Sequence, residues 1–333
     1  MSIEWSPVEA SVPVPGAPTR EDVERASERI HGLAHRTPVL TCSGLDSLTG
    51  ARLFFKCENF QKVGAFKFRG AANAVLSLPE SEAERGVATH SSGNHAQALA
   101  LAARLRGVPA HIVMPQNSPR IKVEAVRGYG GRIVFCAPTQ EDRERTLREV
   151  VARTGAVFIH PYDNPAVIAG QATCARELLE EVPDLDLLIA PVGGGGLASG
   201  TALAARFWSP STRVVAAEPK EADDAYRSLQ AGRILPSLAP KTIADGLRTS
   251  LGELTFPILR ALLNAVITVS EEAIVQAMRL TWERMKVLVE PSAAVPLAAL
   301  LEAGLSAQGQ RVGIVLSGGN LDLDFLPWQE KKN

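Results

Sequence analysis

Short apolar runs alternate with longer amphipathic segments along most of the chain. The runs read as strands and lie at residues 52–57, 87–90, 110–115, 132–137, 156–161, 185–192, 213–218 and 312–317. Segments with helical periodicity separate them, among others at residues 68–78, 118–130, 140–154, 197–207 and 270–286. Strands that alternate with helices of about 10 to 15 residues are typical of parallel sheets with helical crossovers. The pattern therefore predicts an α/β fold with mostly parallel sheets.

The same pattern predicts how the chain is divided. The strands and helices of residues 79–165 read as a small α/β domain, inserted into a large cofactor-binding domain formed by residues 1–78 and 166–333. Residues 1–18 are rich in proline and have no periodicity, so we expect an extended lead-in. A helix should begin after Thr19, because Asp22 completes a capping box with it, and should run to about Ala34.

One lysine lies in an unusually apolar segment. Lys67 stands between Phe66 and Phe68 in the sequence GAFKFRGAANAV, with Arg69 as the other charge. Apolar neighbours and a nearby cation lower the pKa of an amine, and a neutral amine condenses with carbonyl groups. Taken by itself, the segment favours instead a lysine whose side chain extends to solvent.

Two segments that join a strand to a helix carry groups suited to anions. Residues 91–95 (SSGNH) precede a helix of small residues, so hydroxyls and backbone N–H groups meet at a helix N-terminus. We expect a carboxylate there, with a plain helix cap as the alternative. The second segment consists of Gly193, Gly194, Gly195 and Gly196. Four glycines after a strand can direct several N–H groups at one point, which predicts a phosphate site.

These features leave two cofactors open. Gly193, Gly195 and Ala198 fit the dinucleotide-binding pattern G-x-G-x-x-[GA], with Glu218 about twenty residues later, which would indicate a nicotinamide-dependent oxidoreductase. That alternative gives Lys67 and the serine segment no function. Pyridoxal phosphate instead has an aldehyde, a phosphate and a ring nitrogen, which suit the lysine, the glycines and the hydroxyl of SGGN, the sequence after the last strand.

Composition narrows the class of partner. The chain has 333 residues, 46% hydrophobic and 21% charged, and a formal net charge of -1. This balance favours neither nucleic acid nor an anionic membrane, so we expect a small-molecule substrate. The chain has no apolar run of membrane-spanning length and no signal-like N-terminal segment, and its four cysteines are widely spaced. We therefore expect a cytoplasmic protein with reduced cysteines.

Eight segments, in order, resemble one family. GAFKFRGA, HSSGNHAQALALAA, PAVIAGQ, PVGGGGLASG, AAEPKEADDAY, TIADGL, WERMKVLVEPSAA and SGGN are similar to segments of the fold type II pyridoxal-phosphate enzymes of the serine/threonine dehydratase and serine racemase group. The resemblance covers roughly residues 20–325. It implies the tryptophan synthase β-like fold, with two three-layer α/β/α domains, and a homodimer.

The resemblance also assigns roles to single residues. It implies that Lys67 binds the cofactor aldehyde and then removes the Cα proton of the substrate, and that Ser317 faces the ring nitrogen. Phe66 would lie against the pyridine ring, and Asn94 would hydrogen-bond the ring hydroxyl. The other expected cofactor contacts are the four glycines, Leu197, Gly246 and Glu290. The expected substrate contacts are Ser91, Ser92, Asn94, His95 and Arg143.

A divalent cation is a further implication. By their spacing, Glu218, Asp224 and a loop carbonyl such as that of Ala222 fit either a hard cation or a solvated acidic turn. In the resemblance these positions match the family's cation site, so we expect Mg²⁺ or Ca²⁺.

The expected reaction is α,β-elimination. A serine hydroxyl at Ser317 does not keep the ring nitrogen protonated as a carboxylate would, which favours elimination over a long-lived carbanion. We expect an ammonia-lyase that converts L-serine, L-threonine or threo-3-hydroxyaspartate to a keto acid and ammonia. Ser92 resembles the second acid/base of racemases, so serine racemase is the alternative, alone or as a second activity. Arg143 is a candidate for a second substrate carboxylate, with a solvated helix face as the alternative, and Tyr162 replaces the asparagine of animal serine racemases.

Overall fold

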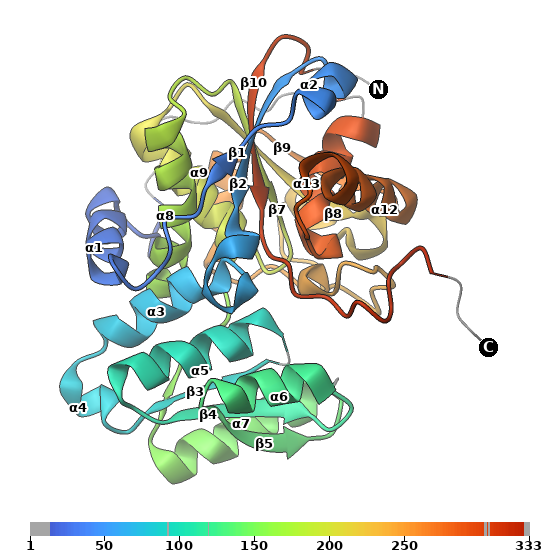
Figure 1. Cartoon of the computed structure of the whole chain (residues 1–333). Coiled ribbons are helices and arrows are strands. Elements are labelled where there is room, and N and C mark those ends of the chain that lie inside the picture. Colours follow the sequence, from blue (N-terminus) through green and yellow to red (C-terminus); the bar gives the residue numbers. More distant parts are fainter. Residues whose placement is uncertain (1–13, 92, 119, 303–304, 306, 330–333) are drawn as a thin grey trace.

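Two sheets form the frame of the molecule. The computed structural model describes residues 14–91, 93–118, 120–302, 305 and 307–329, so most of the predicted lead-in lies outside the described residues. A six-stranded sheet has the order β1-β2-β10-β7-β8-β9, and a four-stranded sheet has the order β5-β4-β3-β6. Figure 1 shows the small sheet below the large one, with helices α3 and α5 between them.

The large sheet is parallel except at one edge. Its strands are β1 (Val39–Leu40), β2 (Arg52–Cys57), β7 (Leu187–Pro191), β8 (Arg213–Pro219), β9 (Ala265–Val269) and β10 (Arg311–Leu316). The edge strand β1 pairs antiparallel with β2, and the other pairs are parallel. Successive residues of β7 point to opposite faces, so Leu187 and Ile189 lie in one core and Leu188 and Ala190 in the other.

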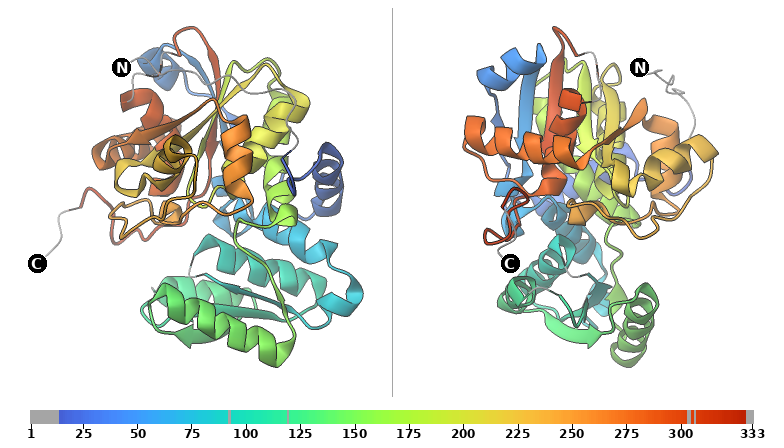
Figure 2. Two further views of the ribbon diagram at one scale, coloured as in Figure 1. Left: turned by 180° about the vertical axis from the view of Figure 1, so that it is seen from behind. Right: turned by 90° about the vertical axis from the view of Figure 1, so that its right-hand side faces the viewer.

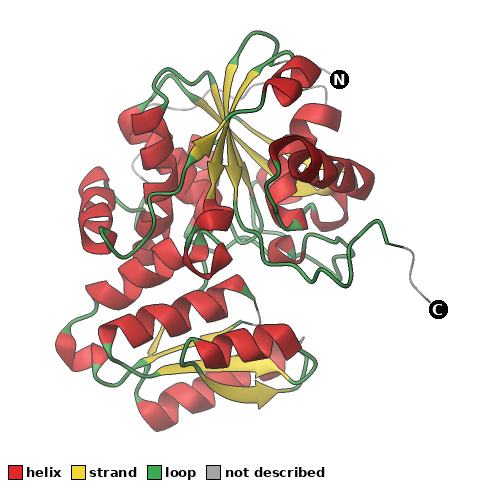
Figure 3. Cartoon of the chain, in the orientation of Figure 1, coloured by secondary structure: helices red, strands yellow, loops and turns green. Residues whose placement is uncertain are grey.

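Helices cover both faces of the large sheet. One face packs against α2 (Ser43–Thr49), α12 (Glu271–Leu280) and α13 (Pro291–Glu302). The other packs against α1 (Arg20–Ile30), α8 (Pro165–Glu181), α9 (Gly196–Trp208), α10 (Asp224–Ala231) and α11 (Thr255–Leu262). Figure 3 shows the yellow strands of this sheet between the red helices of the two layers.

The small sheet is parallel throughout the described residues. Its strands are β3 (Val87–His90), β4 (Ala110–Pro115), β5 (Arg132–Cys136) and β6 (Val157–Phe158). Helices α3 (Lys67–Ser77), α5 (Asn94–Arg106) and α6 (Arg120–Gly128) share a core with one face, and α7 (Gln140–Thr154) covers the other. Figure 2 shows the two stacked α/β units from two further sides. The predicted three-layer α/β fold is confirmed, whereas the domain boundaries stay a prediction.

Most predicted elements are present, with shifts at their ends. The capping box of Thr19 and Asp22 opens α1, but α1 ends at Ile30 rather than near Ala34. The helix predicted at residues 270–286 changes at residue 281 into a π-helical turn, which Lys286 ends in the left-handed conformation. Strand β9 and helix α11 were not predicted, because residues 254–269 form one apolar run that periodicity does not divide. No helix within the described ranges has both the length and the apolar character that crossing a membrane requires.

Glycines let α3, α8 and α9 approach one another closely. A Cβ atom at Gly170 of α8 would lie 2.6 Å from the Arg69 carbonyl oxygen of α3, and one at Gly200 of α9 would lie 2.6 Å from the backbone nitrogen of Ala172. Non-bonded atoms do not approach so closely, so a larger residue would push the helices apart. The packing of these helices therefore fixes the start of α3, where Lys67 lies.

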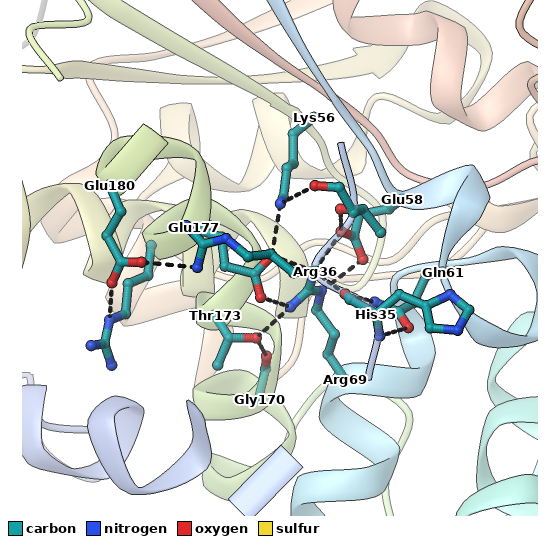
Figure 4. A network of polar contacts seen from close by, with 12 residues as sticks. His35, Arg36, Lys56, Glu58, Gln61, Arg69, Gly170, Thr173, Glu177 and Glu180 are labelled. Atoms are coloured by element: carbon teal, nitrogen blue, oxygen red, sulfur yellow. Dashed lines mark hydrogen bonds and ion pairs between the residues drawn. The ribbon is translucent and has the colours of Figure 1, made fainter. Parts of the chain in front are cut away.

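Three buried charges, on Lys56, Glu58 and Arg69, and the partly exposed Glu177 join β2, α3 and α8 (Figure 4). Arg69 donates two hydrogen bonds to Glu58, at 2.8 and 2.9 Å, and two to Glu177, at 2.7 and 2.8 Å. Lys56 donates to Glu177 at 2.7 Å. Burial alone would raise the pKa of Glu58, but the Arg69 guanidinium outweighs it and lowers that pKa. Two cations thus balance two carboxylates, which is what makes buried charge tolerable.

We expect the substitution Arg69→Met to lower the free energy of unfolding by about 3–5 kcal/mol, because it leaves the buried Glu58 and the partly exposed Glu177 with one cation. Denaturant titration measures this loss. Arg25→Met removes an exposed arginine that pairs with Glu21 and should cost less than about 1 kcal/mol. Equal small losses in the two variants would contradict a stabilising role for the buried cluster.

Candidate active site

Segments that follow three strands of the large sheet meet at its carboxyl edge. Lys67 begins α3 after β2, Ser317 follows β10, and the glycine loop, residues 193–196, lies between β7 and α9. The Phe66 N–H donates to the Ser317 carbonyl at 3.0 Å, and Ala65 forms an isolated bridge with Gly318. The carboxyl ends of parallel strands are where α/β sheets bind ligands. The predicted lysine and serine therefore lie together in the expected place.

The Lys67 amine lies among apolar groups. Its Nζ donates to the Pro161 carbonyl at 2.8 Å and lies 5.1 Å from the centre of the Phe66 ring and 6.0 Å from that of the Tyr162 ring. Burial lowers the pKa of Lys67 to about 8, although the Glu290 carboxylate opposes this shift. Near neutral pH, a useful fraction of the amine is therefore neutral and able to condense with an aldehyde.

The glycine loop presents unused N–H groups. From residue 193 to residue 198, no backbone N–H donates a hydrogen bond to another described residue. Gly195 caps α9 in the left-handed conformation, at φ 91°. A Cβ atom at Gly194 or Gly196 would lie 2.3 or 2.9 Å from the Tyr162 side chain, so the loop has room for glycine alone. Free N–H groups at the positive end of a helix form a cradle that suits a phosphate.

A second loop packs against the glycine loop. Gly246 lies in a 3-10 turn, η4 (Asp245–Leu247), and its N–H donates to the Ser292 hydroxyl at 3.1 Å. A Cβ atom at Gly193 would lie 2.9 Å from the backbone of this turn. Leu197 is buried in the first turn of α9. The structure thus brings Gly246 and Leu197 next to the predicted phosphate site.

Two polar side chains lie behind this edge of the sheet. Ser317 is 3% exposed, and its hydroxyl has no hydrogen-bond partner among the described residues. The Glu290 carboxylate accepts from Asn94 Nδ2, at 3.0 and 3.2 Å, and from the Asn320 N–H at 3.1 Å. Burial raises the pKa of Glu290 to about 7, and Asp245 adds to this shift. Ser317 therefore offers a neutral hydroxyl, and Glu290 a carboxyl close to its titration midpoint.

The predicted carboxylate site lies at the start of α5, opposite Glu290. Asn94 is the first residue of this helix. The Ser91 hydroxyl accepts from the Gly93 N–H at 3.3 Å, which turns the loop toward the helix. Ser92 lies outside the described residues. The placement of Asn94 beside Glu290 joins the small sheet to the large one across the site.

His95 is a buried side chain in the first turn of α5, and its substrate contact stays a prediction. Its Nε2 lies 3.3 Å from the Ile159 carbonyl, and its buried Nδ1 has no partner among the described residues. Burial lowers the pKa of His95 well below its usual value, and the Lys67 charge adds to the shift. A neutral ring that donates from Nε2 has an acceptor at Nδ1. Nδ1 of His95 can thus accept a hydrogen bond from a donor, whereas the N–H groups at the start of α5 suit a carboxylate better.

Arg143 lies on α7, which covers the other face of the small sheet. Its Nε is buried and has no hydrogen-bond partner in the described part of the chain. Burial lowers the pKa of His90, and Arg143 adds to this shift while Glu144 opposes it. His90 immediately precedes Ser91, so the Arg143 charge acts on the segment that leads into the predicted substrate loop. No described contact joins Arg143 to Lys67.

The predicted cation ligands come together at the end of β8. Glu218 accepts from the N–H groups of Ala225, at 3.2 Å, and Tyr226, at 2.6 Å, whereas Asp224 Oδ2 is buried without a partner among the described residues. Burial raises the pKa of both carboxyls, that of Asp224 to about 6. A divalent cation would take up the unpartnered oxygen, and the Ala222 carbonyl could complete an oxygen ligand set. The described residues contain no cluster of three His, Cys, Asp or Glu side chains suited to a metal, so carbonyl or water ligands would be required.

Sequence reasoning gave no site role to Tyr162 or Asn320. Tyr162 was noted for replacing the asparagine of animal serine racemases, but its side chain packs against Gly194 and Gly196, and its neighbour Pro161 accepts the Lys67 hydrogen bond. Asn320 ends the SGGN motif, and its side chain reaches Asn94. The motif singled out this asparagine, whereas nothing in the local sequence indicated the contacts of Tyr162.

Comparisons with known proteins agree with this geometry. Residues 30–318 match the model of the family described as pyridoxal-phosphate dependent enzyme. The chain is 53% identical over 311 residues to the β-hydroxyaspartate dehydratase of Paracoccus denitrificans, covering 93% of this chain and 99% of that protein. It is 50% identical over 316 residues to the serine racemase of Arabidopsis thaliana, covering 93% and 95%.

The solved structures that match this chain indicate the same family. The structure of maize serine racemase, 49% identical, superposes with a TM-score of 0.91 over 92% of this chain and 95% of that one. A dinucleotide-binding oxidoreductase, the alternative that the glycine pattern left open, is not supported by these matches. From the shared fold, the carboxyl-edge site and the matched residues, the chain belongs to the pyridoxal-phosphate dependent enzymes of fold type II.

Proposed function

We propose that this enzyme is an ammonia-lyase, or dehydratase, that converts an L-β-hydroxy amino acid to a keto acid and ammonia. The observation that carries the proposal is the Lys67 amine, whose pKa is lowered to about 8, at a sheet edge that also holds a cradle of unused N–H groups. The similarity to a β-hydroxyaspartate dehydratase supports elimination as the reaction.

The residues present fit pyridoxal phosphate. Lys67 would hold the aldehyde carbon, and the N–H groups of residues 193–197 would hold the phosphate. Phe66 would lie beside the ring, Asn94 would meet the ring hydroxyl, and Ser317 would meet the ring nitrogen through a neutral hydroxyl. When bound, the cofactor withdraws electrons from the Cα atom of the substrate.

The chain's own groups supply binding and proton transfer. The Lys67 amine would take the Cα proton of the substrate, and an amine with a pKa of about 8 is a base matched to neutral pH. Ser91 and the N–H groups at the start of α5 hold the substrate carboxylate. The packing of Tyr162 against the glycine loop narrows the space beside Lys67 and helps to exclude water.

We further propose threo-3-hydroxyaspartate as the preferred substrate among the three expected ones. A relative named β-hydroxyaspartate dehydratase supports this choice. A second carboxylate needs a cation, and Arg143 has a buried Nε without a partner among the described residues. Serine and threonine, which lack this carboxylate, would use the arginine less.

The experiment that tests the function begins with the visible absorption spectrum of the purified protein. L-serine, L-threonine and L-threo-3-hydroxyaspartate are then added in turn, and keto acid, ammonia and D-isomer are assayed. We expect a cofactor band that shifts on addition of the substrate, together with equal amounts of keto acid and ammonia. A protein that stays colourless after incubation with pyridoxal phosphate would contradict the proposal.

Serine racemase is the second candidate, favoured by the similarity to plant serine racemases. Inversion needs an acid/base on each face of the cofactor, and Ser92 is our candidate for the second one. D-serine formed in excess of keto acid in the same assay would make racemisation the main activity. A homodimer and a cytoplasmic location stay predictions.

The first prediction concerns Lys67. Lys67→Ala should abolish the visible band and all turnover, whereas Lys62→Ala, which changes a lysine of the same segment, should retain both. In the wild-type protein without cofactor, the rate of binding pyridoxal phosphate should rise about tenfold per pH unit below pH 8 and level off above it, because the neutral amine reacts. Stopped-flow absorbance measures this rate, and a rate that is flat from pH 6 to 9 would rule out the assigned amine.

A second prediction concerns substrate choice. Arg143→Met should lower kcat/KM for 3-hydroxyaspartate about 10- to 100-fold, as expected for loss of a charge-assisted hydrogen bond. The value for L-serine should change less than about threefold. Arg145→Met, on the exposed side of the same helix, is the matched control. If Arg143→Met lowers kcat/KM equally for both substrates, Arg143 does not bind the second carboxylate.

We also propose a divalent cation, Mg²⁺ or Ca²⁺, at Glu218, Asp224 and the Ala222 carbonyl. A cation at a hundredfold excess over its Kd should add ~2.7 kcal/mol to the free energy of unfolding. This gain should disappear in Asp224→Asn and persist in Asp223→Asn, whose half-exposed carboxylate pairs with Arg227. Thermal unfolding with and without chelator measures it, and an equal gain in both variants would place the cation elsewhere.

A further inference from the structure

A closed set of hydrogen bonds surrounds the side chain of Asn94. Asn94 Nδ2 donates to both carboxylate oxygens of Glu290, at 3.0 and 3.2 Å, and Asn94 Oδ1 accepts from Asn320 Nδ2 at 2.9 Å. Asn320 Nδ2 also donates to the Val63 carbonyl at 2.6 Å, and the Asn320 N–H donates to Glu290 at 3.1 Å. The Asn94 side chain is therefore held at one end by Glu290 and at the other by the Asn320 side chain, while the Asn320 backbone N–H holds Glu290.

Two glycines make room for this arrangement. A Cβ atom at Gly64 would lie 2.6 Å from the Asn320 side-chain oxygen, and one at Gly318 would lie 2.8 Å from a Glu290 carboxylate oxygen. The Glu290 N–H donates to the Gly318 carbonyl at 3.0 Å, and the Gly319 N–H donates to the Gly64 carbonyl at 2.9 Å. The segments before Lys67 and after β10 thus hold Glu290 and Asn320 through contacts that do not involve Asn94.

This environment determines which way the Asn94 amide faces. The Asn320 amide group donates, so it selects the Oδ1 end of Asn94, and the Glu290 carboxyl, whose oxygens also accept from the Asn320 N–H, takes the Nδ2 end. Rotating the Asn94 amide by half a turn would set oxygen against the Glu290 carboxylate and nitrogen against the Asn320 donor. Nδ2 carries two N–H groups, and one of them, shared between the two Glu290 oxygens, leaves the second as a donor.

We propose that Asn320 and Glu290 are positioning residues that hold the Asn94 amide as a donor toward the ring hydroxyl of the bound cofactor. This inference rests on the proposed function, in which Asn94 meets that hydroxyl. An ionised ring oxygen accepts only, so an amide turned the other way would repel it. The two residues act through Asn94 and contact neither substrate nor reacting atoms in this role.

The pH titration of the cofactor's visible band tests the proposal. A donor to the ring oxygen weakens that oxygen's hold on the proton it shares with the cofactor–lysine nitrogen, so losing the donor raises the pH midpoint of the band. We expect Asn94→Ala to raise the midpoint by about one pH unit, the size of one hydrogen bond to a charged group. Asn320→Ala should raise it in the same direction, and the double variant should shift no further than Asn94→Ala alone.

Matched variants make the outcome decisive. Asn59→Ala removes a nearby amide that bonds to the Leu288 carbonyl and does not touch Asn94, so its midpoint should equal that of the wild type. If Asn320→Ala does not fold, Asn320→Leu keeps the volume, lacks the donor and should shift the midpoint equally. An unchanged midpoint in the folded Asn320 variant, or additive shifts in the double variant, would overturn the inference. Loss of the band in Lys67→Ala would still uphold the proposed function, so the two failures are distinguishable.

Discussion

The buried pairing of Arg69 with Glu58 is the constraint on which the site depends. The two residues flank the segment that carries Lys67, and the bidentate contact between them, at 2.8 and 2.9 Å, closes that segment into a loop. Both side chains are fully buried, so each would cost several kcal/mol if it stood alone. Glu177 and Lys56 complete the balance of charge and tie the loop to α8 and β2. Because breaking these ion pairs would cost so much free energy, they fix the position of the start of α3.

The fixed loop explains the chemistry of the lysine. With α3 anchored by Arg69 in its first turn and by the Phe66 bond to Ser317, the Lys67 side chain is largely buried, and its amine lies 5.1 Å from the centre of the Phe66 ring and 6.0 Å from that of the Tyr162 ring. Desolvation then lowers the pKa of its amine, and the single opposing charge, on Glu290, is itself drawn toward neutrality by burial. The ionisable groups of the site are therefore close to neutral. The N–H groups of the glycine loop then provide the main electrostatic attraction for an anion.

Contacts between the two sheets complete the site. The Lys67 bond to Pro161 and the Asn94 bonds to Glu290 and Asn320 join parts of the chain that lie far apart in sequence. The salt bridge of Lys122 with Asp245, at 2.6 Å, adds a contact between α6 and η4. Each sheet thus supplies half of the groups around the lysine, so the site exists only where the two sheets are held against each other.

The sequence by itself determined the strands, most helices and the positions of the glycine loop, Lys67 and Ser317, because these depend on local periodicity and on strand ends that lie at one edge of a parallel sheet. It did not divide the mostly apolar run that holds α11 and β9, since apolar residues predominate in both elements. Only the tertiary structure decided that Arg69 is buried and paired, that Tyr162 packs on the glycine loop, and that Asn320 and Glu290 orient Asn94. Most of those facts depend on contacts between residues far apart in the chain, such as Arg69 with Glu177 and Asn94 with Glu290, and neither the spacing nor the type of the residues encodes them.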